Sequence, residues 1–230
     1  MSEFFSSFVF KHPAPVILAG PTGCGKTVFI QNVLEQQLIQ PMPEKIYFCY
    51  TAWQPTYDKL MQNNHLNIQF HKGMLDANCL DSFTPKLIIL DDMMSEIKDS
   101  DEVGNIFTKY SHYKNISVFL VIQNLFVKGT STRDMSLNTH YIVLFNNPRD
   151  RAQIGYLGRE MFPQKRNFIV DAYTDACLQP FGYLILDFKQ TTPEQMRVLT
   201  GVLNKEKKIV YVHRGGVISS KNNKKKQKKN

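Results

Sequence analysis

The sequence predicts an α/β fold in which a mostly parallel central sheet is covered by helices on both faces. Short, wholly apolar segments recur along the 230 residues, and segments with helical periodicity stand between them. Strands that are apolar on both sides are typical of parallel sheets buried between helices. A third observation refines this class: residues 20–27 read GPTGCGKT and directly follow the apolar segment PVILA. Such a loop between a strand and a helix cradles nucleotide phosphates, so the expected fold is that of a P-loop NTPase.

The apolar segments and the amphipathic segments alternate along the chain. The expected strands cover residues 15–20, 45–50, 67–70, 86–92, 116–123, 139–145 and 182–188. The expected helices cover residues 25–40, 100–110, 149–162 and 166–178. We expect Pro41 to end the first helix, because proline cannot continue one. A last helix is expected at Thr192, which begins a capping-box pattern with proline at the first helical position.

The glycine-rich segment is expected to bind ATP and Mg²⁺. Its residues are Gly20, Pro21, Thr22, Gly23, Cys24, Gly25, Lys26 and Thr27. The glycines allow backbone N–H groups to point inward at phosphate oxygens. Lys26 should reach the β- and γ-phosphates, and the Thr27 hydroxyl should bind Mg²⁺. Oxidation of Cys24 would block nucleotide, but a small residue at a variable position is the simpler interpretation.

Two further polar elements follow apolar strands. Asp91 and Asp92 end the segment KLIILDD, and Gln123 ends ISVFLVIQ. Ligands of parallel sheets bind at the carboxyl ends of the strands, so these side chains should lie near the phosphate loop. We expect Asp91 to hold Mg²⁺ through water, Asp92 to polarise the attacking water, and Gln123 to contact both water and the γ-phosphate. The alternatives are a helix-capping aspartate and an ordinary strand exit.

Charge is concentrated at the end of the chain. The last ten residues, KNNKKKQKKN, supply six of the eight net positive charges. Such a segment is expected to be disordered, and to contact nucleic acid, direct nuclear import or aid solubility. We therefore divide the chain into a lead-in over residues 1–13, loosely attached, a P-loop domain over 14–204 and a basic tail over 205–230.

Composition excludes several other classes. No apolar run approaches the roughly 20 residues of a membrane-spanning helix, so we expect no membrane partner. The early segment FFSSFVF lacks the flanks of a signal peptide, and we expect an intracellular protein. The four cysteines have no C-x-x-C or zinc spacing, so reduced thiols are expected.

The order of these motifs resembles that of the additional-strand P-loop ATPases. Within them the chain is most similar to the FtsK–HerA superfamily, and there to viral genome-packaging ATPases of the poxvirus, Polinton (Maverick) and adintovirus type. The resemblance rests on ILAGPTGCGKTVFI, KLIILDDMM, VFLVIQNLF and YIVLFNNPRDRAQI, and it extends over roughly residues 13–200. One departure is Asp92, because many relatives have glutamate there.

The resemblance implies an ATP-driven translocase that packages a double-stranded DNA genome. It implies a homo-oligomeric ring that holds DNA by its phosphates, and a capsid or portal component as partner. The implied location is a nuclear or cytoplasmic assembly site, or the virion. It also implies an arginine supplied by the neighbouring subunit, for which Arg133 is the first candidate, followed by Arg149 and Arg151. An ordinary surface arginine is the alternative for each. Lys128 is a candidate DNA contact.

Two other functions remain open from the residues alone. A small-molecule kinase would have an acceptor pocket and an arginine-rich lid, whereas the segment 124–138 holds a single arginine. A nucleotide-dependent assembly module would not need the acidic pair. The segment YTAWQPTYDK, residues 50–59, is either a base-stacking surface or a loop packed against the sheet, and packing is the simpler interpretation.

Overall fold

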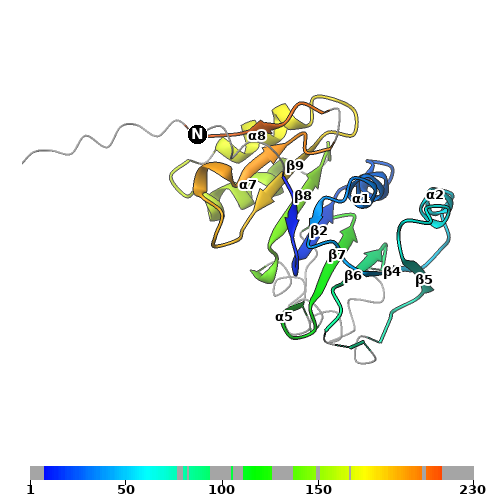
Figure 1. Ribbon diagram of the computed structural model, residues 1–230. Coiled ribbons are helices and arrows are strands. Elements are labelled where there is room, and N and C mark those ends of the chain that lie inside the picture. The colour runs from blue at the N-terminus through cyan, green and yellow to red at the C-terminus, as the bar shows by residue number, and fades with distance from the viewer. Residues whose placement is uncertain are drawn as a thin grey trace, which may run out of the picture.

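A computed structural model describes residues 8–76, 80–81, 83–93, 105, 111–125, 137–148, 151–165, 167–203 and 206–213, without the side chains of residues 112 and 151. Nearly all of the helix expected over 100–110 and most of the basic tail lie outside these residues. The described strands form one large sheet and one small pair (Figure 1). The expected α/β class is confirmed.

Nine strands of the described chain form the central sheet, in the order β11-β10-β9-β8-β2-β7-β6-β4-β5. The bounds are β2 (Pro15–Ala19), β4 (Lys45–Tyr50), β5 (Ile68–Lys72), β6 (Lys86–Asp91), β7 (Ile116–Ile122), β8 (Tyr141–Phe145), β9 (Tyr183–Asp187), β10 (Val198–Thr200) and β11 (Ile209–Val210). The neighbouring strands β8, β2, β7, β6, β4 and β5 pair in parallel, and β9, β10 and β11 pair antiparallel. The sheet is therefore mostly parallel, as expected.

Strand β7 lies between the strand before the glycine-rich loop and the strand that ends in the acidic pair. Its register pairs Ala19 of β2 with Ile122, and Asp91 of β6 with Val121. The carboxyl ends of β2, β7 and β6 therefore stand level at one edge of the sheet. This is the additional-strand arrangement.

Helices cover both faces of the sheet (Figure 1). One face packs against α1 (Lys26–Glu35) and α2 (Thr56–Met61), and the other packs against α7 (Arg151–Met161) and α8 (Phe168–Ala176). Successive strand residues alternate between the two cores: Val16 and Leu18 face α1, whereas Ile17 faces α8. In the described part of the chain, no helix is both long and apolar enough to cross a membrane.

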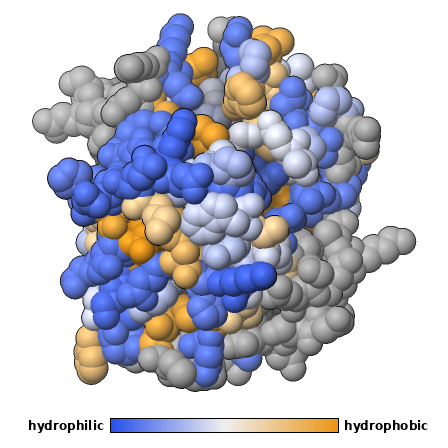
Figure 2. All heavy atoms as spheres, turned by 90° about the vertical axis from the view of Figure 1, so that its right-hand side faces the viewer, coloured by the Kyte–Doolittle hydropathy of each residue, from blue (hydrophilic) through white to orange (hydrophobic). Residues whose placement is uncertain are grey.

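The edge formed by β5 is polar. Its residues are exposed or half-buried, which suits the last strand of a sheet. Figure 2 looks at this side of the molecule and shows hydrophilic residues between small, separate hydrophobic patches. Large apolar patches mark interaction surfaces, and this face does not present one continuous patch of that kind.

The first helix is shorter than its sequence pattern predicted. It ends at Glu35, and Gln37 follows with a φ of 54°, outside the helical region. Ile39–Gln40 then forms β3, which pairs with β1 (Phe10–Lys11). The expectation that the helix continues to residue 40 is wrong, because the chain gains a strand pairing there.

Three other expectations are corrected. Phe10 is 1% exposed and contacts three aromatic rings of the core, so this part of the lead-in is packed rather than loosely attached. The helix expected at Thr192 is only the short 3-10 turn η4 (Glu194–Met196), because β10 begins two residues later. β11 (Ile209–Val210) also continues the sheet into residues 205–230, which we expected to form a disordered tail.

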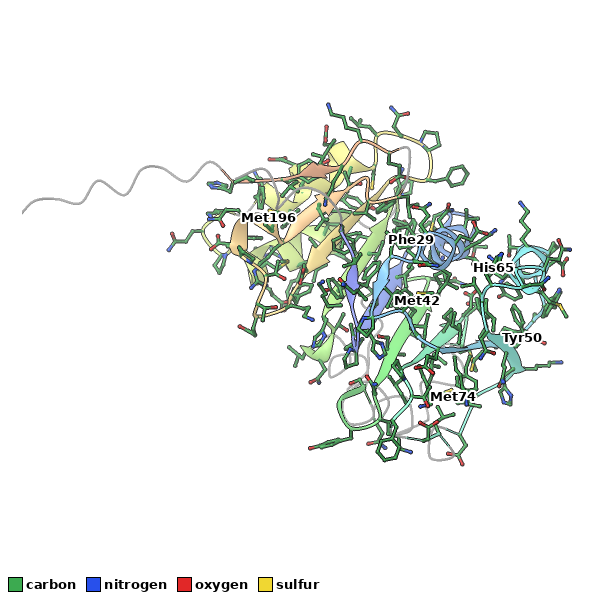
Figure 3. The ribbon with its side chains drawn as sticks, viewed as in Figure 1. Phe29, Met42, Tyr50, His65, Met74 and Met196 are labelled. Atoms are coloured by element: carbon green, nitrogen blue, oxygen red, sulfur yellow. The ribbon has the colours of Figure 1, made fainter. Side chains whose placement is uncertain are left out.

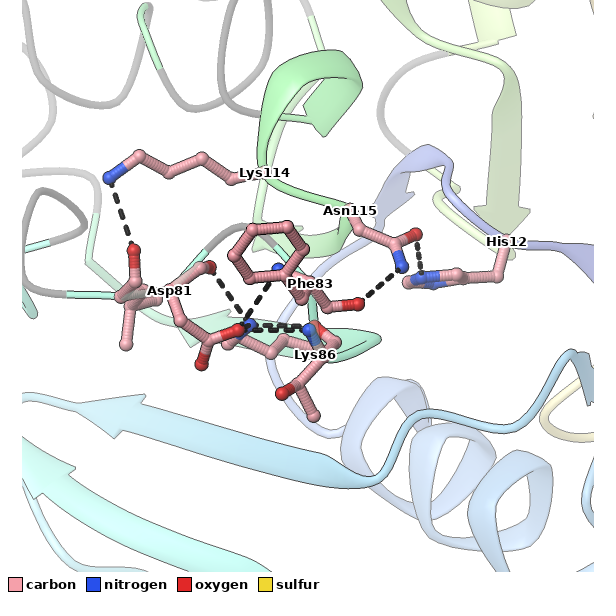
Figure 4. Close-up of polar contacts among 8 residues, drawn as sticks. His12, Asp81, Phe83, Lys86, Lys114 and Asn115 are labelled. Atoms are coloured by element: carbon pink, nitrogen blue, oxygen red, sulfur yellow. Dashed lines mark hydrogen bonds and ion pairs between the residues drawn. The ribbon is translucent and has the colours of Figure 1, made fainter.

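A polar network fixes the opposite edge of the sheet, where β6 and β7 begin (Figure 4). The fully buried Lys86 ammonium contacts the Asp81 carboxylate at 2.9 Å and the Thr84 carbonyl at 2.6 Å. Nearby, His12 Nδ1 lies 2.6 Å from Ser117 Oγ, and His12 Nε2 lies 2.9 Å from Asn115 Oδ1. These contacts hold the lead-in against β7.

The His12 network makes folding depend on pH. Ser117 Oγ accepts the Ala14 N–H, so its own proton can go to His12 Nδ1, and Nε2–H then donates to Asn115. Burial, aided by the charge of Lys86, lowers the pKa of His12 below its ordinary value of 6.5. Because the pKa of His12 is lower in the folded than in the unfolded chain, its contribution to stability is fully present above pH 6.5. This contribution is lost as pH falls below 6.5 and through the lower folded pKa.

We therefore expect the free energy of unfolding to decline between about pH 7 and pH 5. Urea denaturation across this range measures it. A His12→Gln variant keeps a polar side chain but cannot titrate, so its decline should be shallower. Equal slopes for the two proteins would contradict this role of His12.

Candidate functional site

The glycine-rich loop joins β2 to α1 and opens at the carboxyl edge of the sheet. Gly23 and Gly25 have φ values of 77° and 100°, which side chains other than glycine rarely adopt. Gly25 is also the residue before α1, so the free N–H groups of the first helical turn face the loop. A Cβ on Gly20 would lie 2.7 Å from Phe145 Cβ, so close packing requires this glycine.

Lys26 lies over the loop. Its ammonium donates to the carbonyl oxygens of Gly20 at 2.6 Å and of Pro21 at 2.8 Å. Cys24 Sγ lies 3.8 Å from the same nitrogen. Burial raises the pKa of the Cys24 thiol, which keeps it protonated and unreactive. This favours the interpretation of Cys24 as a small packing residue.

Thr27 and Asp91 meet across the width of β7. Thr27 Oγ1 donates to Asp91 Oδ2 at 3.2 Å, and the hydroxyl of the fully buried Tyr57 donates to the same oxygen at 2.9 Å. Burial raises the pKa of Asp91, whereas the two hydrogen bonds and the charge of Lys26 lower it. The carboxylate is thus held in place by hydroxyl donors from two different helices.

Asp92 follows β6 and points toward β7. Its φ of 56° lies in the left-handed region, where aspartate is among the better tolerated residues. Asp92 Oδ1 accepts a hydrogen bond from Gln123 Nε2 at 3.2 Å, and both side chains are exposed. The structure therefore brings together Lys26, Thr27 and both acids, with Gln123 beside Asp92.

These side chains surround a cavity of about 220 Å³. Its wall consists of Thr22, Gly23, Gly25, Lys26, Thr27, Val28, Gln54, Thr56, Asp91, Asp92, Val121, Ile122, Gln123 and Phe181. The five predicted polar side chains beyond Gly25 therefore face one space together with Thr22, Gly23 and Gly25. The predicted loop residues Gly20, Pro21 and Cys24 do not line it. The glycine-rich loop, the acids and the amide supply polar groups to its wall, and Val28, Val121, Ile122 and Phe181 supply apolar ones.

Sequence reasoning missed the contribution of the segment after β4. Gln54 and Thr56 line the cavity, and Thr56 Oγ1 is buried without a hydrogen-bond partner among the described residues. The aromatic contacts of this segment support the expectation that it packs against the sheet, because the Trp53 ring contacts Tyr50, Tyr57 and Phe70. Figure 3 labels Tyr50 at the end of β4, where this aromatic cluster begins.

The candidates for the arginine and DNA contacts are not placed. Arg133, Arg149 and Lys128 lie outside the described residues. Arg151 begins α7, but its side chain is not described. These assignments stay predictions.

The residues present fit a magnesium ion. Mg²⁺ prefers oxygen ligands and is bound in nucleotide sites by one or two protein groups together with phosphates and water. The Thr27 hydroxyl and the Asp91 carboxylate place two such oxygens side by side at the cavity wall. The second acid, Asp92, remains beside them with its carboxylate exposed.

The fold and the site together define the class: this is the fold of the additional-strand P-loop NTPases. Among solved structures, the chain is similar to the genome packaging NTPase B204 from Sulfolobus turreted icosahedral virus 2 in complex with sulfate. The TM-score is 0.54 at 13% identity, with 78% of this chain and 93% of that chain covered.

Curated relatives bear the name packaging protein 1. The protein of human adenovirus C serotype 5 is 23% identical over 222 residues, covering 76% of this chain and 47% of the relative. That of human adenovirus F serotype 40 is 47% identical over 224 residues, covering 77% and 48%. The chain thus spans about half the length of these relatives. No family model matches it.

Tyr57 should stabilise the site through its bond to Asp91. Removing the hydroxyl in Tyr57→Phe leaves a buried carboxylate with one donor fewer, which costs about 1.5–3 kcal/mol for a bond to a charged group. Denaturant unfolding measures this loss. Tyr113→Phe is the matched control, because Tyr113 is 81% exposed, and it should change stability by less than about 0.5 kcal/mol. An unchanged Tyr57→Phe protein would contradict the argument.

Proposed function

We propose that this chain is an ATP-hydrolysing, DNA-translocating motor that packages a viral double-stranded DNA genome. The observation that carries the proposal is the bond between Asp92 and Gln123 at the cavity that also holds Lys26 and Thr27. A phosphate loop alone suits many functions. A second carboxylate beside it, exposed and paired with an amide, suits activation of water.

Each side chain has a defined part in hydrolysis. Lys26 would exchange its loop carbonyl partners for β- and γ-phosphate oxygens, and the α1 N-terminus would stabilise their charge. Thr27 and Asp91 would hold Mg²⁺, which when bound neutralises charge between the β- and γ-phosphates. Asp92 would orient water and accept its proton.

The covalent change is the same as in other phosphate transfers to water. The oxygen of a water molecule bonds to the γ-phosphorus, and the bond between that phosphorus and the β–γ bridging oxygen breaks. ADP and inorganic phosphate leave. Gln123, which donates to Asp92, would contact the same water and so would couple β7 to the state of the nucleotide.

The relatives support the viral and packaging parts of the proposal. Two of them are named packaging protein 1, from adenoviruses, and the protein B204 is named a genome packaging NTPase. By the same reasoning we propose double-stranded DNA, a homo-oligomeric ring and a capsid or portal component as partners, at a nuclear or cytoplasmic assembly site. The branch with poxviruses, Polintons and adintoviruses stays a prediction.

The same site argues against the two alternative functions, a small-molecule kinase and a nucleotide-dependent assembly module. A small-molecule kinase protects its phosphoryl group from water, whereas Asp92 is exposed beside Gln123. A nucleotide-dependent assembly module has no need of a second acid. An assembly role alongside hydrolysis remains compatible with the residues.

Two substitutions separate binding from turnover. Lys26→Ala should abolish nucleotide binding, because the main phosphate cation is lost. Asp92→Asn should keep binding but lower the rate of hydrolysis by about 10²–10⁴-fold, the usual contribution of a general base. Calorimetry and phosphate release measure the two effects. Asp171→Asn, on an exposed part of α8, is the control and should hydrolyse normally. Full activity of Asp92→Asn would remove this assignment.

DNA should stimulate hydrolysis at low salt, and the stimulation should weaken as salt rises, because phosphate contacts are electrostatic. Rates with and without double-stranded DNA test this. If DNA has no effect at low salt, translocation is contradicted while nucleotide binding stands.

An Arg133→Ala protein mixed with Asp92→Asn should recover ATP hydrolysis if the arginine acts in the neighbouring subunit. No recovery at any mixing ratio would exclude Arg133.

A further inference from the structure

We propose that Phe181 is the stacking face for the nucleobase of the bound nucleotide, with Val28 beside it. The inference deepens the proposed function and rests on it, because it needs a nucleotide in the cavity. Phe181 lies in the connection between α8 and β9, far from the phosphate loop in sequence, yet it lines the same cavity. The glycine-rich motif gives no sign of it.

The position of the ring follows from Gly25. A Cβ built on Gly25 would lie 3.2 Å from Phe181 Cδ1, so the ring rests directly against the residue that precedes α1. Val28 is three residues further on, which places it on the same side of the helix. Both side chains line the cavity. They form an apolar wall next to the end of the helix that would receive phosphates.

Both side chains are unusually exposed for their type. Phe181 is 67% exposed and Val28 is 48% exposed. Packing in the core thus does not explain the phenylalanine. A flat aromatic ring open on one side can stack on any nucleobase, and such stacking is worth about 1–3 kcal/mol per base.

The backbone holds Phe181 at some cost. Its φ is 62°, a conformation that is a genuine outlier for a bulky residue. Gly182, the next residue, has no room for a Cβ, which would lie 2.3 Å from the Ala176 carbonyl oxygen. The connection is therefore pressed against α8 and turns the ring outward. Strain of this kind is found where a side chain has to be presented to a ligand.

The two walls of the cavity have opposite character, and this gives the nucleotide a direction. The acids and Gln123 lie at the carboxyl ends of β6 and β7. Val28 lies in the first turn of α1, and Phe181 packs beside it from the connection between α8 and β9. The terminal phosphate belongs at the acidic wall, where water is activated. The nucleoside then extends toward the apolar wall, and its base meets the ring.

Binding of two probes to the full chain tests the inference. ADP carries a base, and inorganic tripolyphosphate carries phosphates alone. Phe181→Gly removes the ring and suits the positive φ, so the fold should be kept. We expect it to weaken ADP by about 10- to 100-fold and to leave tripolyphosphate unchanged. Phe181→Tyr, which keeps a ring, should bind ADP nearly as the unaltered protein does.

Leu178→Ala is the matched control, because Leu178 lies in the same connection, is 70% exposed and does not line the cavity. It should bind both probes normally. The inference is overturned if Phe181→Gly binds ADP with unchanged affinity, or if it loses both probes equally, which would indicate a general structural role. If the unaltered chain binds neither probe, the proposed function itself fails, and the inference falls with it.

Discussion

The place of β7 between β2 and β6 is the constraint on which the site depends. Neighbouring parallel strands are less than 5 Å apart, so an inserted strand sets the distance between the phosphate loop and the acidic pair. Thr27 and Asp91 still meet, because Thr27 lies in the first turn of α1 and its hydroxyl reaches the last residue of β6. The residue directly after the inserted strand, Gln123, adds an amide beside Asp92. The insertion of β7 between β2 and β6 thus brings the glycine-rich loop, the acids and Gln123 to one cavity.

The same constraint explains how much of the site was readable in the sequence. Lys26, Thr27, Asp91, Asp92 and Gln123 each follow an apolar strand, and local pattern suffices to find them. The pattern of apolar parallel strands predicts that these residues lie together at the carboxyl ends of the strands, since all parallel strands end on the same side of the sheet. The hydrogen bonds between them depend on register, which residue types alone do not specify.

Other parts of the site depend on neighbours that are distant in sequence. Gln54 and Thr56 reach the cavity, and Tyr57 reaches Asp91, only because β4 pairs with β6, and the sequence does not reveal the order of the strands. Phe181 comes from a connection that no motif marks. The early end of α1 had a weak local sign, because leucine and isoleucine at 38–39 suit a helical face and a buried strand equally well. Pairing with β1 decided between them.

Tyr57 connects the aromatic core beneath α2 to the carboxylate of Asp91. Its ring belongs to the aromatic cluster under α2, where it contacts Phe48, Tyr50 and Trp53, while its hydroxyl holds Asp91. A buried carboxylate is costly unless donors surround it, and here one donor is fixed by the core itself. The orientation of the acid is therefore set by residues that never face the cavity opening. Thr56, on the same turn, has a buried hydroxyl without a described partner, which leaves it available to the cavity.

Part of the backbone strain in the described chain lies at the cavity. Of the four non-glycine residues with positive φ in the described chain, Asp92 and Phe181 line the cavity. Conformations of this kind persist only when the surrounding structure fixes them. At the other ends of β6 and β7, Lys86, His12 and Ser117 are buried and fully engaged in hydrogen bonds and an ion pair. This firm anchoring at the starts of β6 and β7 can support the unfavourable backbone of Asp92, which directly follows β6 at the cavity.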